Sequence, residues 1–273
     1  MKKIKKLASL LCLTLMVISC SKNNEEIQGK LIEKKSISAK WEISNSNYKS
    51  LEFNKDGNYI IVKSSTQGKN TLSKNNDGVL FGEYTIVNET TINLIGFGKI
   101  LISSINDTEM NFTIVDDKTA TSIEVSSTKI LKIDSSTSTD LLCRTWKMVE
   151  VDNENVKGTE YELTVIFSQA GTYFVELQNP TEEVNGGLAE WKWKDASEKT
   201  MCYSWDGEPT CTEEDGLVSI TNLTENNLTI VETKYGETNE YKLEVVTDNT
   251  SAKTHQKNNT KNISLKKGIF KNN

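Results

Sequence analysis

The sequence predicts an all-β protein that consists of two tandem small antiparallel barrels. An eight-residue segment occurs twice, at residues 108–115 and 224–231, with six identical positions. Runs with apolar residues at every second position recur about every ten residues, and no run follows a helical period convincingly. Short strands at this spacing are typical of barrels and sandwiches, and 273 residues are enough for two domains.

The N-terminal residues have the pattern of a secretory signal. Four lysines within residues 2–6 precede an apolar run at residues 7–18, which is too short to span a bilayer comfortably. The run ends at Val17-Ile18-Ser19-Cys20, which resembles the lipobox of bacterial lipoproteins. The resemblance implies cleavage before Cys20 and lipidation of its thiol. The alternative is an ordinary signal peptide that ends near a cysteine by chance.

A lipidated Cys20 would anchor the chain to a membrane. In lipoproteins of this kind an Asp after the cysteine retains the protein at the inner membrane, and Ser21 stands there instead. We therefore expect the outer membrane, on its periplasmic or its cell-surface face. Glu25 and Glu26 resemble the acidic export signals of some surface lipoproteins, and the polar residues that follow predict a flexible tether.

The first barrel is expected to begin with a strand at Trp41. Leu51 and Phe53 share one face of the next strand, and an Asn-Lys-Asp-Gly turn leads to Tyr59 on the same face. Asp-Gly between two alternating runs predicts a hairpin, because Gly accepts a positive φ. Further strands are expected at residues 84–86, 92–94, 100–105, 110–115, 121–125 and 130–133.

The landmarks of the first barrel recur in the second half of the chain. Trp146 matches Trp41, and Trp191 takes the place of Tyr84. The offset between matches drifts from 105 to 120 residues, which indicates loop insertions within a structural repeat. We expect a signal peptide at 1–19, a tether at 20–36, barrels at 37–133 and 139–247, a linker at 134–138 and a disordered basic tail at 248–273. Within this tail, residues 264–270 could instead pair as an edge strand.

The second repeat resembles the lipocalin-like domains of bacterial outer-membrane lipoproteins. The likeness lies in the Trp strand, a Phe-x-x-x-Gly-x-Tyr turn, an aromatic strand and the segment at residues 220–230. The first repeat is a degraded copy. Ala39 and Arg144 stand where lipocalins proper carry the Gly of their opening Gly-x-Trp. The resemblance implies small antiparallel barrels that bind something inside them or at their mouths.

Composition argues against nucleic-acid binding and against catalysis. The net charge is −6, and without the ten lysines of residues 1–19 and 249–273 it is −16 for residues 20–248. A body this acidic, with Arg144 as its only arginine, is a poor partner for nucleic acid. The only histidine is His255, so a His-dependent triad and a His metal site are excluded. We expect no catalytic residue, no metal and no cofactor.

Three cysteines remain after the signal peptide and the anchor. Cys202 and Cys211 flank a turn that contains Asp206-Gly207 and Pro209, so they lie on facing arms of a hairpin. This placement predicts a disulfide, since secretion exposes the chain to an oxidising compartment. The alternative is three free thiols, with Cys143 buried in the core beside Trp146.

Aromatic and aliphatic residues of the second repeat are the candidates for ligand binding, and the tryptophans lead this choice because Trp combines a large apolar area with a polar group. The candidate residues are Tyr161, Leu163, Val165, Trp191, Trp193 and Trp205. These residues predict a small apolar ligand in the second barrel. Core packing is the alternative explanation for the same residues.

The alternative function is a non-catalytic structural or interaction module of the cell envelope. It would have filled barrels and dock an envelope protein through loops at residues 63–79 and 178–187. Small barrels are filled by side chains, which favours this alternative, whereas the family resemblance favours a bound ligand.

Overall fold

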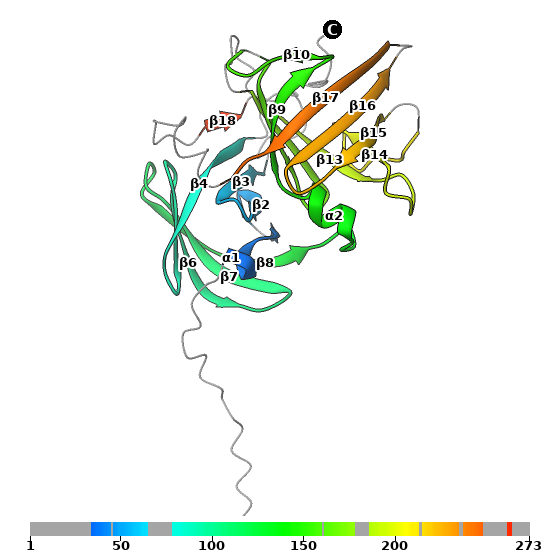
Figure 1. Ribbon diagram of the computed structural model, residues 1–273. Helices are drawn as coiled ribbons and strands as arrows, with labels where there is room; N and C mark the ends of the chain where they lie inside the picture. Colours follow the sequence, from blue (N-terminus) through cyan, green and yellow to red (C-terminus); the bar gives the residue numbers. More distant parts are fainter. Residues whose placement is uncertain are drawn as a thin grey trace, which may run out of the picture. The chain divides into compact units, whose positions relative to one another are not determined.

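The computed structural model describes residues 34–44, 46–64, 78–159, 161–177, 186–212, 215–234, 237–247 and 261–263. These residues form two closed eight-stranded antiparallel barrels in tandem, which confirms the expected fold class (Figure 1). The expected signal peptide, Cys20 and most of the tether lie outside the described residues. Within the described ranges, no helix is both long enough and apolar enough to cross a membrane.

The first barrel is an up-and-down meander in which each strand pairs with the next. After α1 (Lys34–Ile37) come β1 (Lys40–Ile43), β2 (Tyr48–Phe53), β3 (Asn58–Lys63), β4 (Val79–Asn88), β5 (Thr91–Leu94), β6 (Gly98–Ile105), β7 (Glu109–Asp116) and β8 (Thr121–Ile130). The barrel closes where β8 pairs antiparallel with β1, with Trp41 opposite Lys129. Closure leaves no open edge around the ring.

The second barrel repeats this order. After α2 (Thr137–Leu142) come β9 (Thr145–Val151), β11 (Leu163–Phe167), β12 (Thr172–Leu177), β13 (Gly186–Trp193), β14 (Thr200–Ser204), β15 (Gly216–Leu223), β16 (Asn227–Lys234) and β17 (Glu237–Val245). β17 pairs with β9 to close the ring, and the short β10 (Glu154–Asn155) extends β9 as a hairpin. The eight strands of the first barrel thus match β9 and β11 to β17 in order.

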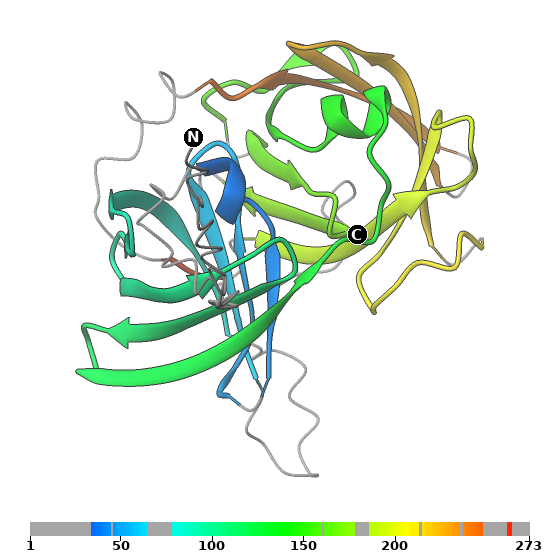
Figure 2. The ribbon, with the colours of Figure 1, turned by 90° about the horizontal axis from the view of Figure 1, so that it is seen from below.

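A short helix lies at one end of each barrel and fixes a tryptophan (Figure 2). The indole Nε1 of Trp41 donates to the carbonyl of Ile37 at 3.0 Å, and that of Trp146 donates to the carbonyl of Leu142 at 2.9 Å. Both tryptophans are fully buried. α1 starts at Lys34, within the expected tether, and α2 starts at Thr137, within the expected linker. Helices of one or two turns are too short to show a helical period.

The repeated turns confirm the match between the two halves of the chain. The backbone N–H of Asn54 donates to the carbonyl of Asn58, and that of Ser168 donates to the carbonyl of Thr172, both at 3.0 Å. The carbonyls of the same two residues accept hydrogen bonds from Tyr84 at 2.9 Å and from Trp191 at 3.0 Å. Trp191 therefore does take the place of Tyr84. A glycine with positive φ completes each turn. Gly57 has a φ of 94° in the first turn, and Gly171 has a φ of 77° in the second.

One strand prediction is wrong, and part of the expected tail forms a strand. β8 is one strand from Thr121 to Ile130, whereas the sequence predicted two strands at residues 121–125 and 130–133. Part of the tail that was expected to be disordered forms β18 (Lys261–Ile263), which pairs antiparallel with β4. β18 lies just before the edge strand considered at residues 264–270, which is outside the described residues.

Matched strands of the two barrels also meet each other. A separate apolar cluster, which we call the inter-barrel cluster, joins Ile60, Val79 and Phe81 to Ile166 and Phe174, with Val62 and Leu188 at its edge. The rings of Phe81 and Phe174 lie 4.7 Å apart. Because β2 to β4 match β11 to β13, the same face of each repeat forms the contact, as in a two-fold interface.

Candidate functional site

The interiors of both barrels are filled by large side chains. In the first barrel, Trp41, Phe53 and Tyr59 are at most 2% exposed, and they belong to one apolar cluster with residues from every strand of the ring. The second barrel is packed in the same way around Trp146 and Tyr173. An eight-stranded barrel is just wide enough for its own side chains to fill it. The described interiors are therefore packed cores.

The structure divides the six predicted ligand residues into three groups. Leu163, Val165 and Trp191 lie together in the interior of the second barrel and are at most 4% exposed. Trp193 and Trp205 are half-buried and pack against that core. Tyr161 lies apart from the core, with 56% of its surface exposed. Leu163, Val165 and Trp191 are therefore part of the core. Of the six predicted residues, Trp193 and Trp205 are the two that both contact the core and reach solvent.

Each of the two half-buried tryptophans is held by its neighbours. Trp193 donates from Nε1 to the hydroxyl of Thr139 at 2.9 Å and meets Trp191 edge-on, with ring centroids 5.3 Å apart. The ring centroid of Trp205 lies 5.6 Å from that of Tyr173 and 5.9 Å from that of Tyr203. Edge-to-face and tilted contacts at these distances are favourable. Both tryptophans therefore continue the aromatic core toward solvent.

A buried carboxylate lies within the second barrel and was missed in the sequence. Glu232 is 3% exposed and accepts a hydrogen bond from the hydroxyl of Tyr203 at 2.6 Å. Burial, and then the nearby Glu232 charge, raise the pKa of Tyr203 and of Tyr241. Leu228 and Ile230 precede Glu232 at every second position, so strand alternation places Glu232 on the inner face. That alternation is the signal that could have identified it.

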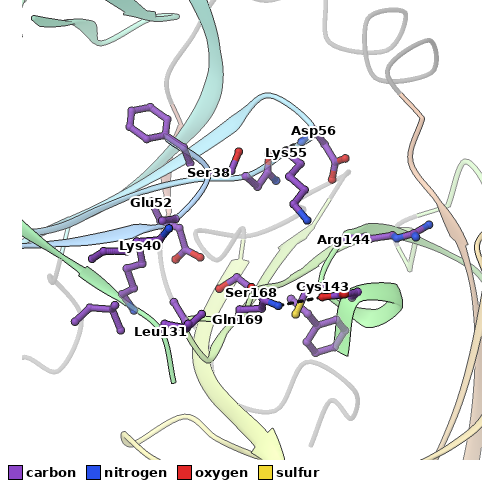
Figure 3. Close-up of a pocket in the computed structure, with 18 residues that line it drawn as sticks. Ser38, Lys40, Glu52, Lys55, Asp56, Leu131, Cys143, Arg144, Ser168 and Gln169 are labelled. Carbon is purple, nitrogen blue, oxygen red and sulfur yellow. Dashed lines mark hydrogen bonds between the residues drawn. The ribbon is translucent and has the colours of Figure 1, made fainter. Parts of the chain in front are cut away.

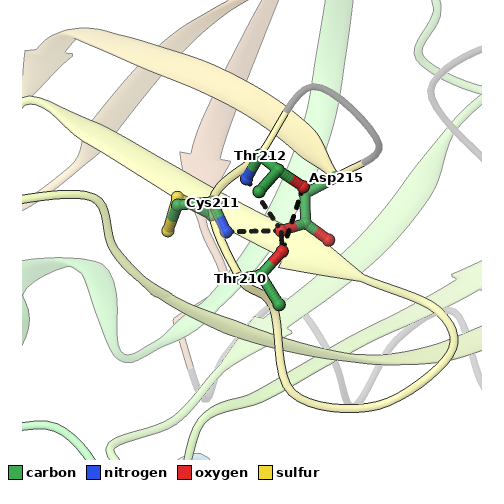
Figure 4. The surroundings of a disulfide bond; sticks show 5 residues. Thr210, Cys211, Thr212 and Asp215 are labelled. Atoms are coloured by element: carbon green, nitrogen blue, oxygen red, sulfur yellow. Dashed lines mark hydrogen bonds between the residues drawn. A yellow bond between two sulfur atoms is a disulfide. The ribbon is translucent and has the colours of Figure 1, made fainter.

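The expected disulfide between Cys202 and Cys211 is present, with Cα atoms 5.3 Å apart (Figure 4). The carboxylate of Asp215 stabilises the loop, since Oδ2 accepts from the N–H of Cys211 at 2.5 Å and from the hydroxyl of Thr210 at 3.1 Å. Cys143 is a free thiol that is half-buried against the core. Its burial raises its pKa, an effect that the nearby Lys55 ammonium opposes.

A cavity of about 170 Å³ lies between the two barrels (Figure 3). Matched segments of the two repeats line much of it. Residues 38–40 and 143–144 lead into the first strands, and residues 53–56 and 167–170 run from a strand end into the repeated turns. Lys129, Ile130, Leu131, Asp140 and Glu52 complete the lining. Sequence reasoning could not find this cavity, because it depends on how two distant segments meet.

The two sides of the cavity differ in how the turns reach the other barrel. On one side, Asn54 donates to the hydroxyl of Thr145 at 3.1 Å, and Asp56 accepts from the Thr145 N–H at 2.9 Å. On the other side the matched turn residues are Ser168 and Ala170, which are shorter. The Ser168 hydroxyl is buried without a hydrogen-bond partner among the described residues. The cavity thus opens beside the turn whose side chains are too short to repeat the contact.

Charged and polar side chains make up much of the lining of this cavity. Its lining combines four cationic side chains with three carboxylates and several hydroxyl and amide groups. Across the described ranges, no three His, Cys, Asp or Glu side chains cluster closely enough to hold a metal ion. The predicted docking loops at residues 63–79 and 178–187 lie almost entirely outside the described residues. In comparisons with known proteins, no protein-family model and no curated protein sequence matches this chain.

Proposed function

We propose that the chain is a lipid-anchored, non-catalytic protein of the bacterial outer membrane, in which two lipocalin-like barrels serve as an interaction module of the cell envelope. The observation that supports this role best is the packing of the barrel interiors. Trp41, Trp146 and Tyr173 are fully buried at positions where a container for a large apolar ligand would need free space. A filled barrel interacts through its surface and its loops.

The anchor rests on the N-terminal sequence. A basic start, an apolar run and Val17-Ile18-Ser19-Cys20 follow one another in the order that lipid attachment requires. We expect the full chain, expressed in a Gram-negative bacterium, to incorporate radiolabelled palmitate and to fractionate with the outer membrane. The Cys20→Ser variant is the matched test, and it should lose both properties. Recovery of the unsubstituted protein without label, in the periplasm, would contradict the anchor.

Native mass spectrometry tests the filled barrels. The secreted chain from residue 21 to residue 273 should have the mass of the polypeptide alone at all collision energies. The mass should also be lower by two hydrogen atoms, because Cys202 and Cys211 are joined. A mass excess that disappears on denaturation and that corresponds to a large apolar molecule would contradict the filled-barrel proposal.

A small apolar ligand at the second barrel is the second candidate. It is favoured by Trp193 and Trp205, which are half-buried at the solvent side of an aromatic cluster. Trp offers an apolar face and a donor in such a position. In this case the mass excess should be present in the unsubstituted chain and absent from Trp205→Ala. Tyr161→Ala is the control, because Tyr161 is exposed and should leave the mass excess unchanged.

A further inference from the structure

β18 is an extra strand beside a ring that closes without it. The pairing of β4 with β5 covers residues 84–88 of β4. The N-terminal part of β4 extends past the end of β5, and β18 pairs with it there, at residues 79–81 (Figure 1). β3 pairs with the same residues. Because β3 takes one edge of this part of β4, β18 occupies the other edge, which β5 does not reach.

The second barrel shows that the repeated fold does not require such a strand. β13 matches β4, and its register with β14 runs from residue 190 to residue 193. Residues 186–189 extend past β14 in the same way as residues 79–83 extend past β5. Among the described strands, β12 alone pairs with residues 186–189. β18 is therefore an addition to the barrel and not one of its eight strands.

The register of β18 places polar residues opposite buried apolar ones. Residues 79–81 of β4 are Val, Leu and Phe, and they are at most 7% exposed. Ile263 stands opposite the first of them, Asn262 opposite the second and Lys261 opposite the third. Residues directly opposite in an antiparallel pair share a face of the sheet, where apolar pairs are stabilising. Two of the three positions are thus mismatched, and β18 is a weak occupant of this edge.

The edge of β4 presents apolar residues on both of its faces. Leu80 belongs to the core of the first barrel, whereas Val79 and Phe81 belong to the inter-barrel cluster. When a strand is added to a sheet edge, backbone hydrogen bonds provide affinity and side chains at alternate positions provide specificity. An added strand with three consecutive apolar residues would extend both clusters at once. The edge therefore favours a segment of that kind over the tail.

We propose that this edge of β4 is a docking site for an extended segment of an envelope protein, which carries three consecutive apolar residues and displaces β18. The segment would pair antiparallel with residues 79–81, in the register that β18 has. This role rests on the interaction module proposed above, because it names the surface through which that module would bind its partner. In the absence of the partner, β18 covers an edge that would otherwise be open to unspecific pairing.

Two synthetic peptides serve as probes. One has the sequence of residues 257–267, which includes β18, and the other carries Lys261→Val and Asn262→Val in the same peptide. Each is labelled with fluorescein, and fluorescence anisotropy measures its binding to the secreted chain of residues 21–273. We expect the substituted peptide to bind with a Kd about tenfold lower, because two apolar pairs replace two mismatched ones.

Release of β18 should make the edge more accessible. Asn262→Pro/Ile263→Pro, which we call the release variant, must remove one N–H directed at β4, because successive N–H groups of a strand point to opposite edges. We expect it to bind the substituted peptide with a Kd about tenfold below that of the unsubstituted protein, since the tail no longer competes. Asn272→Pro/Asn273→Pro is the matched control, because it places the same two prolines at the end of the chain. Its Kd should equal that of the unsubstituted protein.

Amide hydrogen exchange, read by mass spectrometry, locates the bound peptide. The release variant should exchange faster than the unsubstituted protein in residues 79–83, because the second edge of β4 is uncovered. The substituted peptide should restore the protection of these residues. Residues 186–189 of β13 are the internal control, and their exchange should stay the same throughout.

The proposal is wrong if the substituted peptide binds neither the unsubstituted protein nor the release variant. It is equally wrong if the peptide binds but leaves the exchange of residues 79–83 unchanged, because it then lies elsewhere. Equal Kd values for the two peptides would mean that the edge is built for the tail, and that its external occupant is the tail of a second copy and not another protein.

Two safeguards keep the test decisive. If the release variant does not fold, the unsubstituted protein and the two peptides still answer the question. A failure of the docking site also differs from a failure of the proposed function, because palmitate labelling and the mass measurement test the anchor and the filled barrels separately.

Discussion

The carboxylate of Asp56 in the first barrel accepts a hydrogen bond from the backbone N–H of Thr145 in the second, with Oδ2 and N 2.9 Å apart. Thr145 is 1% exposed and Asp56 is half-buried, so this contact between the barrels is partly shielded from solvent. It lies beside the hydrogen bond from Asn54 to the Thr145 hydroxyl. These bonds, the inter-barrel cluster and the hydrogen bond from Thr172 to Glu52 connect the two barrels.

The inter-barrel cluster should couple the unfolding of the two barrels. Phe174 is fully buried against Phe81, so Phe174→Asp places an unpaired charge in an apolar contact. We expect a single calorimetric transition for the unsubstituted protein and two transitions for Phe174→Asp, because each barrel keeps its own core. Val87→Asp is the control, since Val87 is 60% exposed. One unchanged transition in Phe174→Asp would contradict the coupling.

The two tryptophans at the barrel ends should contribute similarly to stability. Trp146→Phe removes the indole that donates to the buried Leu142 carbonyl, and Trp41→Phe does the same at Ile37. A buried acceptor without its donor costs about 1–3 kcal/mol, to which the loss of ring volume adds. Urea unfolding should show this loss for both variants. Trp205→Phe should cost less, because Trp205 is only half-buried; an equal loss would argue against the indole hydrogen bonds as the cause.

Loss of the disulfide should destabilise the second barrel. Cys202 and Cys211 are nine positions apart, and a loop of this length contributes about 2–3 kcal/mol by restricting the unfolded chain. The Cys202→Ala/Cys211→Ala double variant should lose about this amount in urea unfolding. Dithiothreitol should lower the stability of the unsubstituted protein and leave the double variant unchanged. If dithiothreitol also destabilised the double variant, its effect would not come from reduction of the Cys202–Cys211 disulfide.

Buried tyrosines should make the second barrel sensitive to alkali. Burial raises the pKa values of Tyr173, Tyr203 and Tyr241 above the unfolded value near 10, with Glu232 contributing to each. Because the folded pKa is the higher one, their contribution to stability is complete below about pH 10 and declines as the pH rises further. We expect the free energy of unfolding to fall above about pH 10.

The measurement is absorbance of tyrosinate together with circular dichroism. Part of the tyrosinate signal should appear only when the fold is lost, and Tyr203→Phe should reduce that part. Complete ionisation of all tyrosines near pH 10 in a protein that is still folded would rule out the buried arrangement around Glu232.

Local patterns in the sequence were sufficient for the fold and for the disulfide. The match between Trp41 and Trp146, and the recurrence of the Phe-x-x-x-Gly-x-Tyr turn, depend on contacts within one repeat, and the structure contains them. Cys202 and Cys211 lie on two arms of one turn, so their approach also follows from nearby residues. The helices α1 and α2 were missed because one or two turns do not establish a period.

The site between the barrels depends on contacts that no local pattern reveals. Ile60 and Phe174 face outward on strands whose inward-facing residues are apolar as well. In the sequence, a strand that is buried on both faces is recognisable only as a continuous apolar run. Which outer face meets which partner is decided by packing of the complete barrels. The sequence therefore directed attention to Trp193 and Trp205 and gave no reason to examine the cavity between the barrels.

A tandem chain can change one half of a symmetric contact without changing the other. In a homodimer of identical barrels, replacement of an acid such as Asp56 would remove it from both copies of the interface at once. Here Asp56 bonds to Thr145, while Ala170 stands at the matched position and lines the cavity. Covalent fusion thus allows one copy of the contact to keep the barrels joined while the other copy is free to acquire a different use.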